Sequence, residues 1–590
     1  MTSGGDDTPR LGFLRAIAID FDGTLTSDGA PPSQVALDAL AGFRDDGGLV
    51  VLVTGRILTE LTEVFPEVWD RVDAIVAENG AVLWRSAGVS HLAEPVDRRL
   101  QDAVGEHLLR AGDVILAGDI RDSTTTLDHI RALGLDCQLV FNRSALMVLP
   151  AGVNKGTGLS EALAECRVSR HSAVGVGDAE NDRALLDTCE VGAAVANAVD
   201  SLTSFADVRL EEPDGQGVAR LVEEMRRGTR VRSRRRRLSL GSMSSGGSAT
   251  IPSSAATVLF TGAPGSGKSY LVGLMAEHLI AHGYCLLVID PEGDHAELSR
   301  LRGTITYGGH DLPTPTQLAV HFSTRFTSVV LDLSSLDTRE SQAYVARVAA
   351  AVVGSRARFG LPHWIVDDEA HSNFWLLDLP GLLKDPRTGW GLCLASHRVD
   401  WLGDDAASRL DTVVWLPDGG VGDEGVRHLV DMHGAGPHGQ RPRSPSGPPE
   451  ADPPGSRIGA GLLLQAAWDG PSGWFDPGTR LTRHHRHWRK YVHGAMPRHT
   501  RFYVRSDSDE VIAVVSNLTQ LRDVLMACPT GAIAHHSGDG DLSRWLHDVL
   551  HDRATARRFH EVEASVSTGR LTPDQARSAL LRILGDEYGL

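Results

Sequence analysis

Two aspartates one residue apart, Asp20 and Asp22, follow an apolar run near the start of the chain, in the stretch AIAIDFDGTLT. The run predicts a buried strand that ends where the acids begin. Because the side-chain period of a strand is two, both carboxylates leave its end on the same side. Two such carboxylates repel each other, which raises the pKa of one unless a cation such as Mg²⁺ lies between them. One carboxylate can then attack phosphorus while the other serves as general acid and base.

Three later segments carry further candidate groups in a fixed order. LVVLVTGR contains Thr54, LPAGVNKG contains Lys155, and VGVGDAEND contains Asp178 and Asp182. Together with D-x-D-G-T-L at the first strand, these segments resemble the four motifs of the haloacid dehalogenase (HAD) phosphatases. The resemblance implies a magnesium-dependent phosphatase that works through an aspartyl-phosphate.

The same resemblance assigns a role to each of these residues. Asp20 is implied to attack the phosphate, and Asp22 to protonate the leaving oxygen. Thr54 and Lys155 are implied to stabilise the extra negative charge. The implied metal set is Asp20, Asp22, Asp178 and Asp182, with Asp182 as an outer support.

Residues 12 to about 225 alternate between strand and helix patterns, which predicts an α/β domain with a mainly parallel sheet over residues 1–226. About a hundred residues separate the second motif from the third, too many for a simple crossover. Residues 84–145 are therefore expected to form a small α/β cap, with helices at 96–111 and 123–133 and a strand at 137–141. This arrangement is similar to Cof-like, phosphoglycolate and sugar-phosphate phosphatases, which implies a small phosphorylated metabolite as substrate.

Residues 227–254 break the alternating pattern. Eight arginines fall within 226–237, and a Ser/Gly-rich run follows them. The composition predicts a solvated flexible linker, and the alternative is a patch that binds nucleic acid or an acidic partner.

A strand, a glycine-rich turn and a helix follow, in the stretch TVLFTGAPGSGKSYLVGLMAEHLI. This is the pattern G-x-x-x-x-G-K-S in its required context. Gly262, Gly265 and Gly267 let backbone N–H groups surround phosphates at the start of a helix. Lys268 is expected to reach the β- and γ-phosphates of ATP, and Ser269 to bind Mg²⁺.

The stretch HWIVDDEAH predicts an apolar strand that ends in acids. Asp368 is the expected ligand of the Mg²⁺ shell, and Glu369 is expected to orient the attacking water. Asp367 is an alternative for the first role, and Asp332 is a weaker one. An Asp-Glu pair at a strand end suits hydrolysis of ATP rather than transfer of its phosphate to a bound hydroxyl.

VIDPEGD and DDEAH together resemble the HerA/FtsK ATPases, which work as rings. The resemblance implies a RecA-like P-loop domain over 255–433 and leaves open whether the chain forms a homo-oligomer or a ring. His397 and Arg398 occupy the position of the γ-phosphate sensor in that group, and Arg398 or Arg409 could act as an arginine finger. The β-barrel that precedes the ATPase domain of HerA has no counterpart in this chain.

The last part of the chain carries no recognisable chemistry. Residues 434–480 are rich in Gly and Pro and predict a linker, and 481–590 predict a small α+β module. Its expected elements are a hairpin of strands at 500–504 and 511–515, helices at 518–526, 541–552 and 572–587, and a loop at 535–536. His484, His485 and His487 are interpreted as part of an exposed basic, aromatic segment rather than a metal site.

Composition limits the remaining choices. The chain has 590 residues, 58 basic and 76 acidic side chains and a net charge of −18, which disfavours general nucleic-acid binding. Its six cysteines show no C-x-x-C spacing and are expected to be buried free thiols. No apolar stretch reaches membrane-spanning length and the N-terminus lacks a signal-peptide pattern, so a cytoplasmic protein without a membrane segment is predicted.

Three functions remain open at this point. The first is an HAD phosphatase fused to a HerA-like ATPase, with Mg²⁺ and ATP as cofactors. The second is an end-healing enzyme similar to polynucleotide kinase-phosphatases. The third is a regulatory protein whose P-loop senses ATP.

Overall fold

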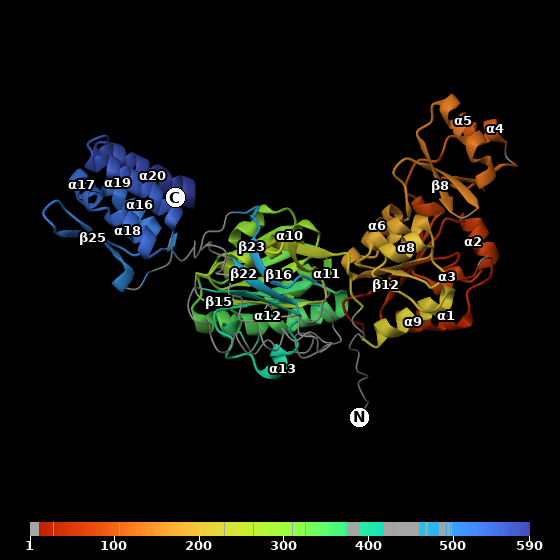
Figure 1. Cartoon of the computed structure of the whole chain (residues 1–590), viewed down its shortest axis with the longest axis horizontal. Helices are drawn as coiled ribbons and strands as arrows, with labels where there is room; N and C mark the ends of the chain where they lie inside the picture. The colour runs from red at the N-terminus through yellow and green to blue at the C-terminus, as the bar shows by residue number, and fades with distance from the viewer. Residues whose placement is uncertain are drawn as a thin grey trace.

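The computed structural model describes residues 11–590 except 28, 106, 143, 229–230, 264, 310, 325, 374–389, 418–428, 430–459, 466–469, 483–490, 493–495, 497 and 551. They form an α/β region with a cap, a second α/β region on a larger sheet, and a C-terminal module of helices with one hairpin (Figure 1). The predicted α/β multidomain fold class is confirmed.

The first region is built on an eight-stranded sheet in the order β12-β11-β10-β1-β2-β3-β4-β5. Its first six strands in that order are parallel, and β4 and β5 pair antiparallel at the edge. The strands are β1 Ala16–Asp20, β2 Leu49–Val53, β3 Ala74–Ala77, β4 Val82–Arg85, β5 Gly88–His91, β10 Ala173–Gly177, β11 Val191–Ala194 and β12 Val208–Arg209.

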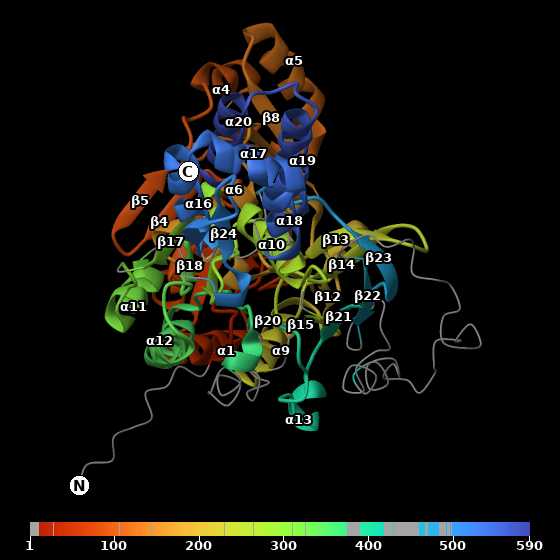
Figure 2. The same cartoon turned by 90° about the vertical axis from the view of Figure 1, so that its left-hand side faces the viewer.

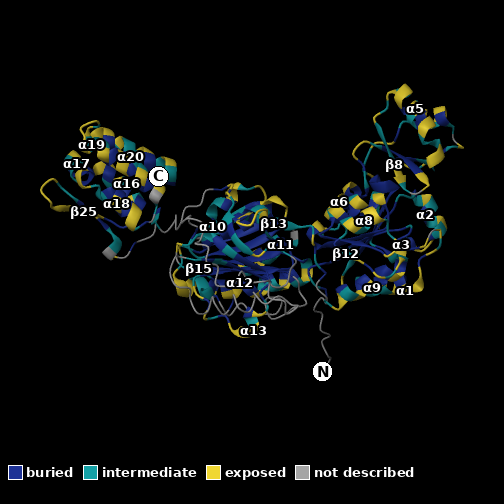
Figure 3. Cartoon of the chain, in the orientation of Figure 1, coloured by how far each residue is buried: buried dark blue, intermediate teal, exposed yellow. Residues whose placement is uncertain are grey.

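Two layers of helices cover this sheet (Figure 1). In β1 the larger Ile17 and Ile19 face one layer and the smaller Ala16 and Ala18 face the other, as the period of two requires. The first layer contains α1 Gln34–Asp45, α2 Leu58–Val64, α3 Val68–Arg71 and α9 Asp214–Arg226. The second contains α6 Lys155–Glu165, α7 Arg183–Thr188 and α8 Asp200–Phe205. Burial is concentrated in the strands between the layers (Figure 3).

The cap has its own antiparallel sheet, in the order β6-β7-β9-β8, and its own apolar core. Its elements are α4 Arg98–Val104, β6 Leu109–Ala111, β7 Leu116–Asp119, α5 Ser123–Leu133, β8 Cys137–Asn142 and β9 Ala145–Pro150. The helix predicted at 123–133 and the strand predicted at 137–141 are confirmed as α5 and β8. The single helix at 96–111 is wrong, because Gly105 ends α4 with φ +107° and β6 follows. The range 84–145 also needs correction, since β4 and β5 belong to the core sheet and β9 extends to 150.

The second region is built on an eleven-stranded sheet in the order β14-β13-β23-β22-β21-β15-β20-β19-β16-β18-β17. The seven strands from β21 to β17 are parallel, and the other four are antiparallel. The parallel strands are β15 Thr257–Gly262, β16 Leu286–Asp290, β17 Thr304–Gly308, β18 Ser328–Asp332, β19 Trp364–Asp367, β20 Gly391–Ser396 and β21 Thr412–Leu416. Helix α10 Lys268–Ala281 packs on one face, and α11 Pro315–Thr324 and α12 Thr338–Phe359 pack on the other.

Both segments predicted as linkers contain strands of this sheet. These strands are β13 Arg237–Met243, β14 Ser248–Pro252, β22 Gly461–Gln465 and β23 Gly473–Pro477. Alternate side chains such as Leu238, Leu240 and Phe475 are buried, so the strands are amphipathic despite their Gly, Ser and Pro content. The linker interpretation is therefore wrong for these residues; it stays a prediction for the rest of both ranges.

The arginine-rich segment that precedes β13 is used inside the molecule. Asp207 accepts hydrogen bonds from the backbone N–H of Arg234 and Arg235 and from the Arg235 guanidinium. Arg236 donates to the Cys189 carbonyl, and Arg232 forms an ion pair of 2.9 Å with Asp411 of the second region. The segment thus holds the two α/β regions together, which weighs against the nucleic-acid interpretation.

A buried polar cluster reinforces this contact between the two regions. Glu190 accepts a hydrogen bond of 2.8 Å from the Tyr284 hydroxyl and lies 2.8 Å from His171 Nδ1. His171 and Tyr284 stack with ring centroids 3.7 Å apart. Arg170 also donates to the carbonyl of His282. Groups this deeply buried are stable only when they are paired, so the contact is expected to be specific.

Among the residues that the structure describes, the C-terminal module packs the hairpin β24–β25 and helices α16 to α20 around a single core (Figure 2). Its elements are β24 Phe502–Arg505, β25 Val511–Val515, α16 Leu518–Ala527, α17 Thr530–Asp539, α18 Asp541–Asp548, α19 Arg553–Ser567 and α20 Pro573–Tyr588. The hairpin is confirmed, and Thr572 caps the start of α20. The loop predicted at 535–536 is wrong, because both histidines lie in α17, and α19 had no prediction. His484, His485 and His487 lie outside the described residues.

A buried ion pair anchors the chain just before this module. Arg480 Nε donates to Glu277 Oε1 of α10 at 2.8 Å, and both side chains are almost fully buried. We expect Arg480→Met to lower the free energy of unfolding by about 3–5 kcal/mol, because it leaves the Glu277 charge buried without its partner. Urea unfolding of the full chain measures this. Arg71→Met removes an exposed pair with Glu67 and should cost about 1 kcal/mol or less; equal losses would contradict the prediction.

Within the described part of the chain, none of the helices is both long and apolar enough to cross a membrane. All six cysteines are free, and four of them are buried. The expectation of buried free thiols therefore holds for these four.

Candidate active sites

The first candidate site lies at the carboxyl ends of β1 and β10, which are parallel neighbours in the first sheet. Asp20 ends β1, and Asp178 directly follows β10. Lys155 is the first residue of α6, whose start is fixed by the capping residue Asn154. Asp182 follows four residues after Asp178 and is buried with the others. Four residues that are far apart in the sequence are thus brought to one place.

Lys155 is the centre of this group. Its Nζ lies 2.5 Å from Asp20 Oδ1 and 2.6 Å from Asp182 Oδ1, and its side chain is completely buried. Burial alone would lower the pKa of Lys155, but the two carboxylates outweigh it and raise that pKa above its usual value. Burial and repulsion from Asp182 raise the pKa of Asp20, and Lys155 opposes that rise only in part.

The carboxylates fit a divalent metal ion. Asp20, Asp178 and Asp182 each offer an oxygen within 4.8 Å of the others. Asp20 Oδ2 is buried without a hydrogen-bond partner, so it has lone pairs free to bind an ion. Asp182 uses its Oδ2 to accept from the N–H of Asp178 and Ala179, which suits a supporting role. Hard oxygen donors of this kind are the ligands that Mg²⁺ prefers.

Asp22 lies outside this carboxylate group. Its two oxygens accept hydrogen bonds of 2.7 and 2.6 Å from the Arg56 guanidinium. The structure therefore does not bring the Asp22 carboxylate to the other predicted metal ligands. Thr54 is buried at the end of β2, where its hydroxyl accepts from the Arg56 N–H. Arg56 was missed, although it ends the motif LVVLVTGR that singled out Thr54.

Glu78 connects the core to the cap and was also missed as a functional residue. It lies in a tight turn with φ +52°, and Asn79 follows with φ +54°. The Glu78 carboxylate accepts hydrogen bonds of 2.7 to 3.0 Å from three backbone N–H groups, at residues 113–115. Backbone strain of this kind is often found at functional sites, and here it directs a carboxylate to the cap.

We expect Glu78→Ala to speed hydrogen exchange at residues 113–115 by at least about tenfold, because each hydrogen bond to a charged acceptor contributes about 1.5–3 kcal/mol. Exchange measured by mass spectrometry on the full chain tests this. Glu94→Ala, at an exposed position nearby, serves as the control. Unchanged exchange in the Glu78 variant would show that this carboxylate does not hold the cap.

The second candidate site begins at the turn between β15 and α10. Gly262, Gly265 and Gly267 have φ values of +152°, +87° and +105°, which other residues rarely adopt. A Cβ at Gly262 would lie 2.2 Å from the Leu416 carbonyl oxygen, so this position also requires glycine for space. Lys268 Nζ donates to the carbonyls of Gly262 and Ala263, at the inner side of the turn.

The acidic strand β19 reaches the same edge of the sheet, with β20 between it and β15. Asp368 is buried and hydrogen-bonded to Ser269 and, at 2.9 Å, to His295. Burial opposes ionisation of Asp368, but the hydrogen bond from His295 and the charge of that ring outweigh it and lower the pKa. Asp368 and Ser269 are therefore together and offer the oxygen ligands that Mg²⁺ prefers; their role as its ligands stays a prediction.

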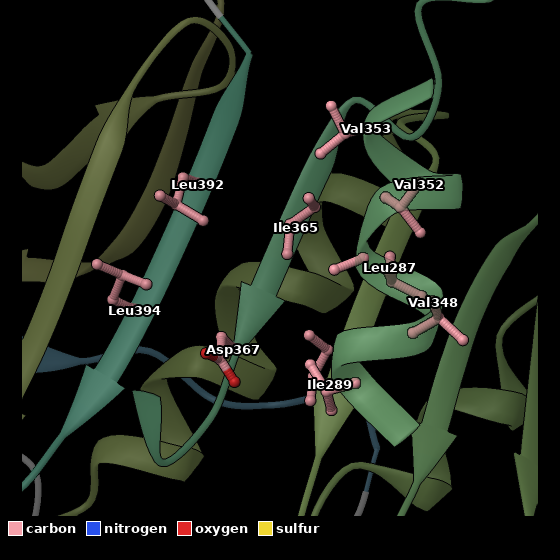
Figure 4. Close-up of a pocket in the computed structure, with 11 residues that line it drawn as sticks. Leu287, Ile289, Val348, Val352, Val353, Ile365, Asp367, Leu392 and Leu394 are labelled. Atoms are coloured by element: carbon pink, nitrogen blue, oxygen red, sulfur yellow. The ribbon is translucent and has the colours of Figure 1, made fainter. Parts of the chain in front are cut away.

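The alternative acids point elsewhere. Asp367 faces an apolar cavity of about 20 Å³ between the sheet and α12, together with Leu287, Ile365 and Leu394 (Figure 4). Burial raises its pKa to about 7, so Asp367 keeps its proton to a higher pH than an ordinary carboxyl group does, and it accepts a hydrogen bond from Asn373. Asp332 lies at the end of β18, beyond β16 and β19 from the P-loop, and accepts from Ser334.

Glu369 follows Asp368 in the left-handed conformation, with φ +61°. Burial and the neighbouring Asp368 charge raise its pKa, and the positive charge of Lys268 opposes that rise. His371 and His397 lie beside it, with their Nδ1 atoms 3.3 and 3.4 Å from Glu369 Oε2. His397 directly follows β20 and therefore lies at the strand end between the P-loop and the acids.

The turn VIDPEGDH contributes groups that sequence reasoning did not assign. Asp290 accepts hydrogen bonds from the backbone N–H of Gly293, Asp294 and His295, which folds the turn back on the strand end. His295 is thereby placed against Asp368. The two arginines considered as fingers have local partners on the surface: Arg398 pairs with Asp400 and Arg409 with Asp405.

Comparison with protein families agrees with this division. Residues 17–103 and 114–222 match the haloacid dehalogenase-like hydrolases, and residues 258–344 match the central domain of helicase HerA. The N-terminal region is therefore an HAD-like hydrolase domain of the Cof and phosphoglycolate phosphatase type. The region that follows it contains a HerA central domain.

Individual relatives cover the first domain. The chain is 27% identical over 226 residues to a phosphoglycolate phosphatase of Methanothermobacter thermautotrophicus. This match covers 35% of the chain and 97% of the relative. The chain is 25% identical over 260 residues to 5-amino-6-(5-phospho-D-ribitylamino)uracil phosphatase YitU of Bacillus subtilis, over 35% of this chain and 96% of the relative. A solved haloacid dehalogenase-like hydrolase from Bacillus subtilis is 19% identical, with a TM-score of 0.31, over 36% of this chain and all of that one.

Proposed function

We propose that the N-terminal domain is a magnesium-dependent phosphomonoesterase that works through a phosphorylated Asp20. The observation that carries the proposal is the buried group of Asp20, Lys155, Asp178 and Asp182, with one Asp20 oxygen unpaired. Mg²⁺, when bound by these carboxylates, would neutralise charge on the phosphate. Such a group serves a folded core poorly, because it concentrates three carboxylates around one cation.

In the proposed reaction Asp20 attacks phosphorus, the bond to the ester oxygen breaks, and Asp22 gives that oxygen its proton. Water then attacks the phosphorus of the aspartyl-phosphate and gives a proton back to Asp22, which restores both carboxyl groups. Lys155 and the Thr54 hydroxyl are proposed to stabilise negative charge on the phosphoryl oxygens. Arg56 is proposed to hold Asp22 in position between the two steps.

The names of the relatives suggest phosphoglycolate as the first substrate to test, beside an aryl phosphate and a panel of other phosphorylated metabolites. The purified chain should release phosphate from at least one of them with Mg²⁺. Removing the ion with EDTA should reduce release to background, and added Mg²⁺ should restore it. Release that is unaffected by EDTA would contradict a metal-assisted reaction.

The pH dependence of this reaction offers a separate prediction. Asp20 must be ionised to attack, so activity should fall at low pH as Asp20 takes up a proton. Lys155 lowers that pKa, so Lys155→Met should move the acidic limb of kcat/KM to higher pH, besides reducing the maximum. The pH profile at saturating Mg²⁺ measures this, and an acidic limb at the same pH in both proteins would contradict it.

We further propose that the second domain binds and hydrolyses ATP. Lys268 would contact the phosphates, Ser269 and Asp368 would hold Mg²⁺, and Glu369 would orient the attacking water. Support comes from the hydrogen bond between Ser269 and Asp368 beside the P-loop glycines. ATP labelled in its γ-phosphate, mixed with a 5′-hydroxyl oligonucleotide, tests the reaction: free labelled phosphate supports hydrolysis, and a labelled oligonucleotide supports the end-healing alternative.

A further inference from the structure

Beside the P-loop, Glu369 and two histidines that the proposed ATP hydrolysis does not use form a set of metal donors. They are Glu369, His371 and His397, each half-buried, with ligand atoms within 4.8 Å of one another. Two imidazole nitrogens and one carboxylate are the donor set of a zinc site with an open fourth position. We propose that these three residues bind a zinc ion next to the P-loop.

The distances support a metal ion better than direct hydrogen bonds. In a tetrahedron with metal bonds of about 2.0–2.1 Å, neighbouring ligand atoms lie about 3.3–3.4 Å apart. Glu369 Oε2 lies 3.3 Å from His371 Nδ1 and 3.4 Å from His397 Nδ1. A charge-assisted hydrogen bond would be shorter, at about 2.7–2.9 Å. The two rings stand nearly perpendicular, at 79°, with centroids 4.4 Å apart.

The backbone positions these donors independently of any ion. Glu369 has the left-handed φ of +61°, a strained conformation for a residue with a side chain, which begins the short turn that carries His371. His397 comes from the neighbouring strand end, and the Ser396 hydroxyl lies 3.3 Å from His371 Nδ1. Each donor thus comes from the end of a strand or from the short turn that follows one, and sites built on such elements are more precise than sites on long loops.

A zinc ion at this position would change the proposed ATPase. It would use the Glu369 carboxylate that is proposed to orient water, so zinc is inferred to inhibit ATP hydrolysis. The inhibitory effect rests on the proposed function of Glu369, but zinc binding does not. Lys268 is close enough for its charge to act on both Glu369 and His371, so the three donors lie beside the residue that is proposed to contact the phosphates.

Cobalt(II) in place of zinc tests the binding directly on the full chain. With excess Mg²⁺ present, one equivalent of Co²⁺ should give the intense visible bands of a tetrahedral site, without thiolate charge-transfer bands, and Zn²⁺ should displace it. His371→Asn and His397→Asn should each weaken Co²⁺ binding by at least about tenfold. Absence of the bands in the wild type, weak bands typical of six-coordinate Co²⁺, or bands of equal strength in both variants would overturn the proposal.

Two controls exclude other histidine clusters. His535, His536 and Asp541 form a second group that could hold a metal ion, and His535→Asn removes one of its histidines. A triple replacement removes His484, His485 and His487. Both should keep the bands, and loss of the bands in either would overturn the assignment. If the His371 or His397 variant does not fold, footprinting of wild-type histidines with diethyl pyrocarbonate decides. Zn²⁺ should protect His371 and His397, and unprotected rings would overturn the site.

Activity is the last readout. Zn²⁺ at one equivalent over the chain should lower ATP hydrolysis at least about tenfold, and a chelator should restore it. If Co²⁺ binds as described but the chain never hydrolyses ATP, the proposed ATPase function fails while the zinc site stands. If ATP is hydrolysed and Co²⁺ gives no tetrahedral bands, the zinc site fails alone.

Discussion

Asp20→Asn is expected to reduce phosphate release by about 10⁴-fold or more, because loss of a covalent nucleophile removes the step on which the others depend. An amide nitrogen and a neutral oxygen cannot replace the attacking carboxylate, although the shape of the side chain is kept. The measurement is kcat/KM for the best substrate of the panel, with Mg²⁺ at saturation. Folding should be preserved, since Asp20 is buried in a site whose repulsion the amide relieves.

Asp187→Asn is a suitable control, because this exposed carboxylate pairs with Arg235 at the surface of the same domain. It should leave phosphate release within about twofold of wild type. ATP hydrolysis by the Asp20 variant should also be unchanged, since Asp20 lies in the other domain. Equal phosphate release by Asp20→Asn and wild type would remove the basis of the proposed reaction.

Glu369→Gln should lower ATP hydrolysis by about 10²–10⁴-fold, the usual contribution of a general base, while ATP binding changes little. The amide has the same shape but cannot accept a proton from water. Turnover is measured as phosphate release from ATP, and binding as the Kd of a fluorescent ATP analogue with Mg²⁺. Lys268→Ala should instead weaken binding itself, since Lys268 lies on the inner side of the P-loop turn.

Asp367→Asn provides the matched control for Glu369. This acid lies two positions earlier, but its side chain faces the apolar cavity beneath the sheet, and burial raises its pKa to about 7. ATP hydrolysis should stay within about threefold of wild type. A loss in Asp367→Asn as large as that in Glu369→Gln would show that the two acids have been assigned the wrong roles.

The sequence predicted which groups would lie together in each candidate site, Asp22 excepted, because each follows an apolar strand or a short motif. Parallel strands place such residues at one edge of a sheet, so Asp20 and Asp178 meet, as do Ser269 and Asp368. The choice between Asp367 and Asp368 depended on which side of β19 each faces, and the structure supplied that direction.

Other features depend on partners that are far apart in the sequence. Arg56 and Glu78 act through contacts with Asp22 and with the cap, and no local pattern reveals such pairs. The strands β13 and β23 lie in Gly-, Ser- and Pro-rich segments, and they form because the edge of the large sheet offers them hydrogen bonds. The same holds for the arginine-rich segment, whose composition suggested a linker or a nucleic-acid patch.

The contact between the two α/β regions gives the fusion a physical basis. Glu190 and Tyr284 meet in a buried polar cluster, and the arginine-rich segment adds ion pairs beside it. Both proposed reactions release phosphate, so each must be measured with the other disabled. ATP hydrolysis is therefore measured in Asp20→Asn, and release of phosphate from other substrates is measured in Glu369→Gln.

Trapping the phosphorylated side chain tests the central claim most directly. Borohydride reduces an aspartyl-phosphate to homoserine, and mass spectrometry of the digested chain then locates the changed residue. With substrate and Mg²⁺ present, we predict homoserine at position 20 in the wild type and none without substrate. Turnover with homoserine at position 22 or 178, or with no modified aspartate at all, would contradict the account.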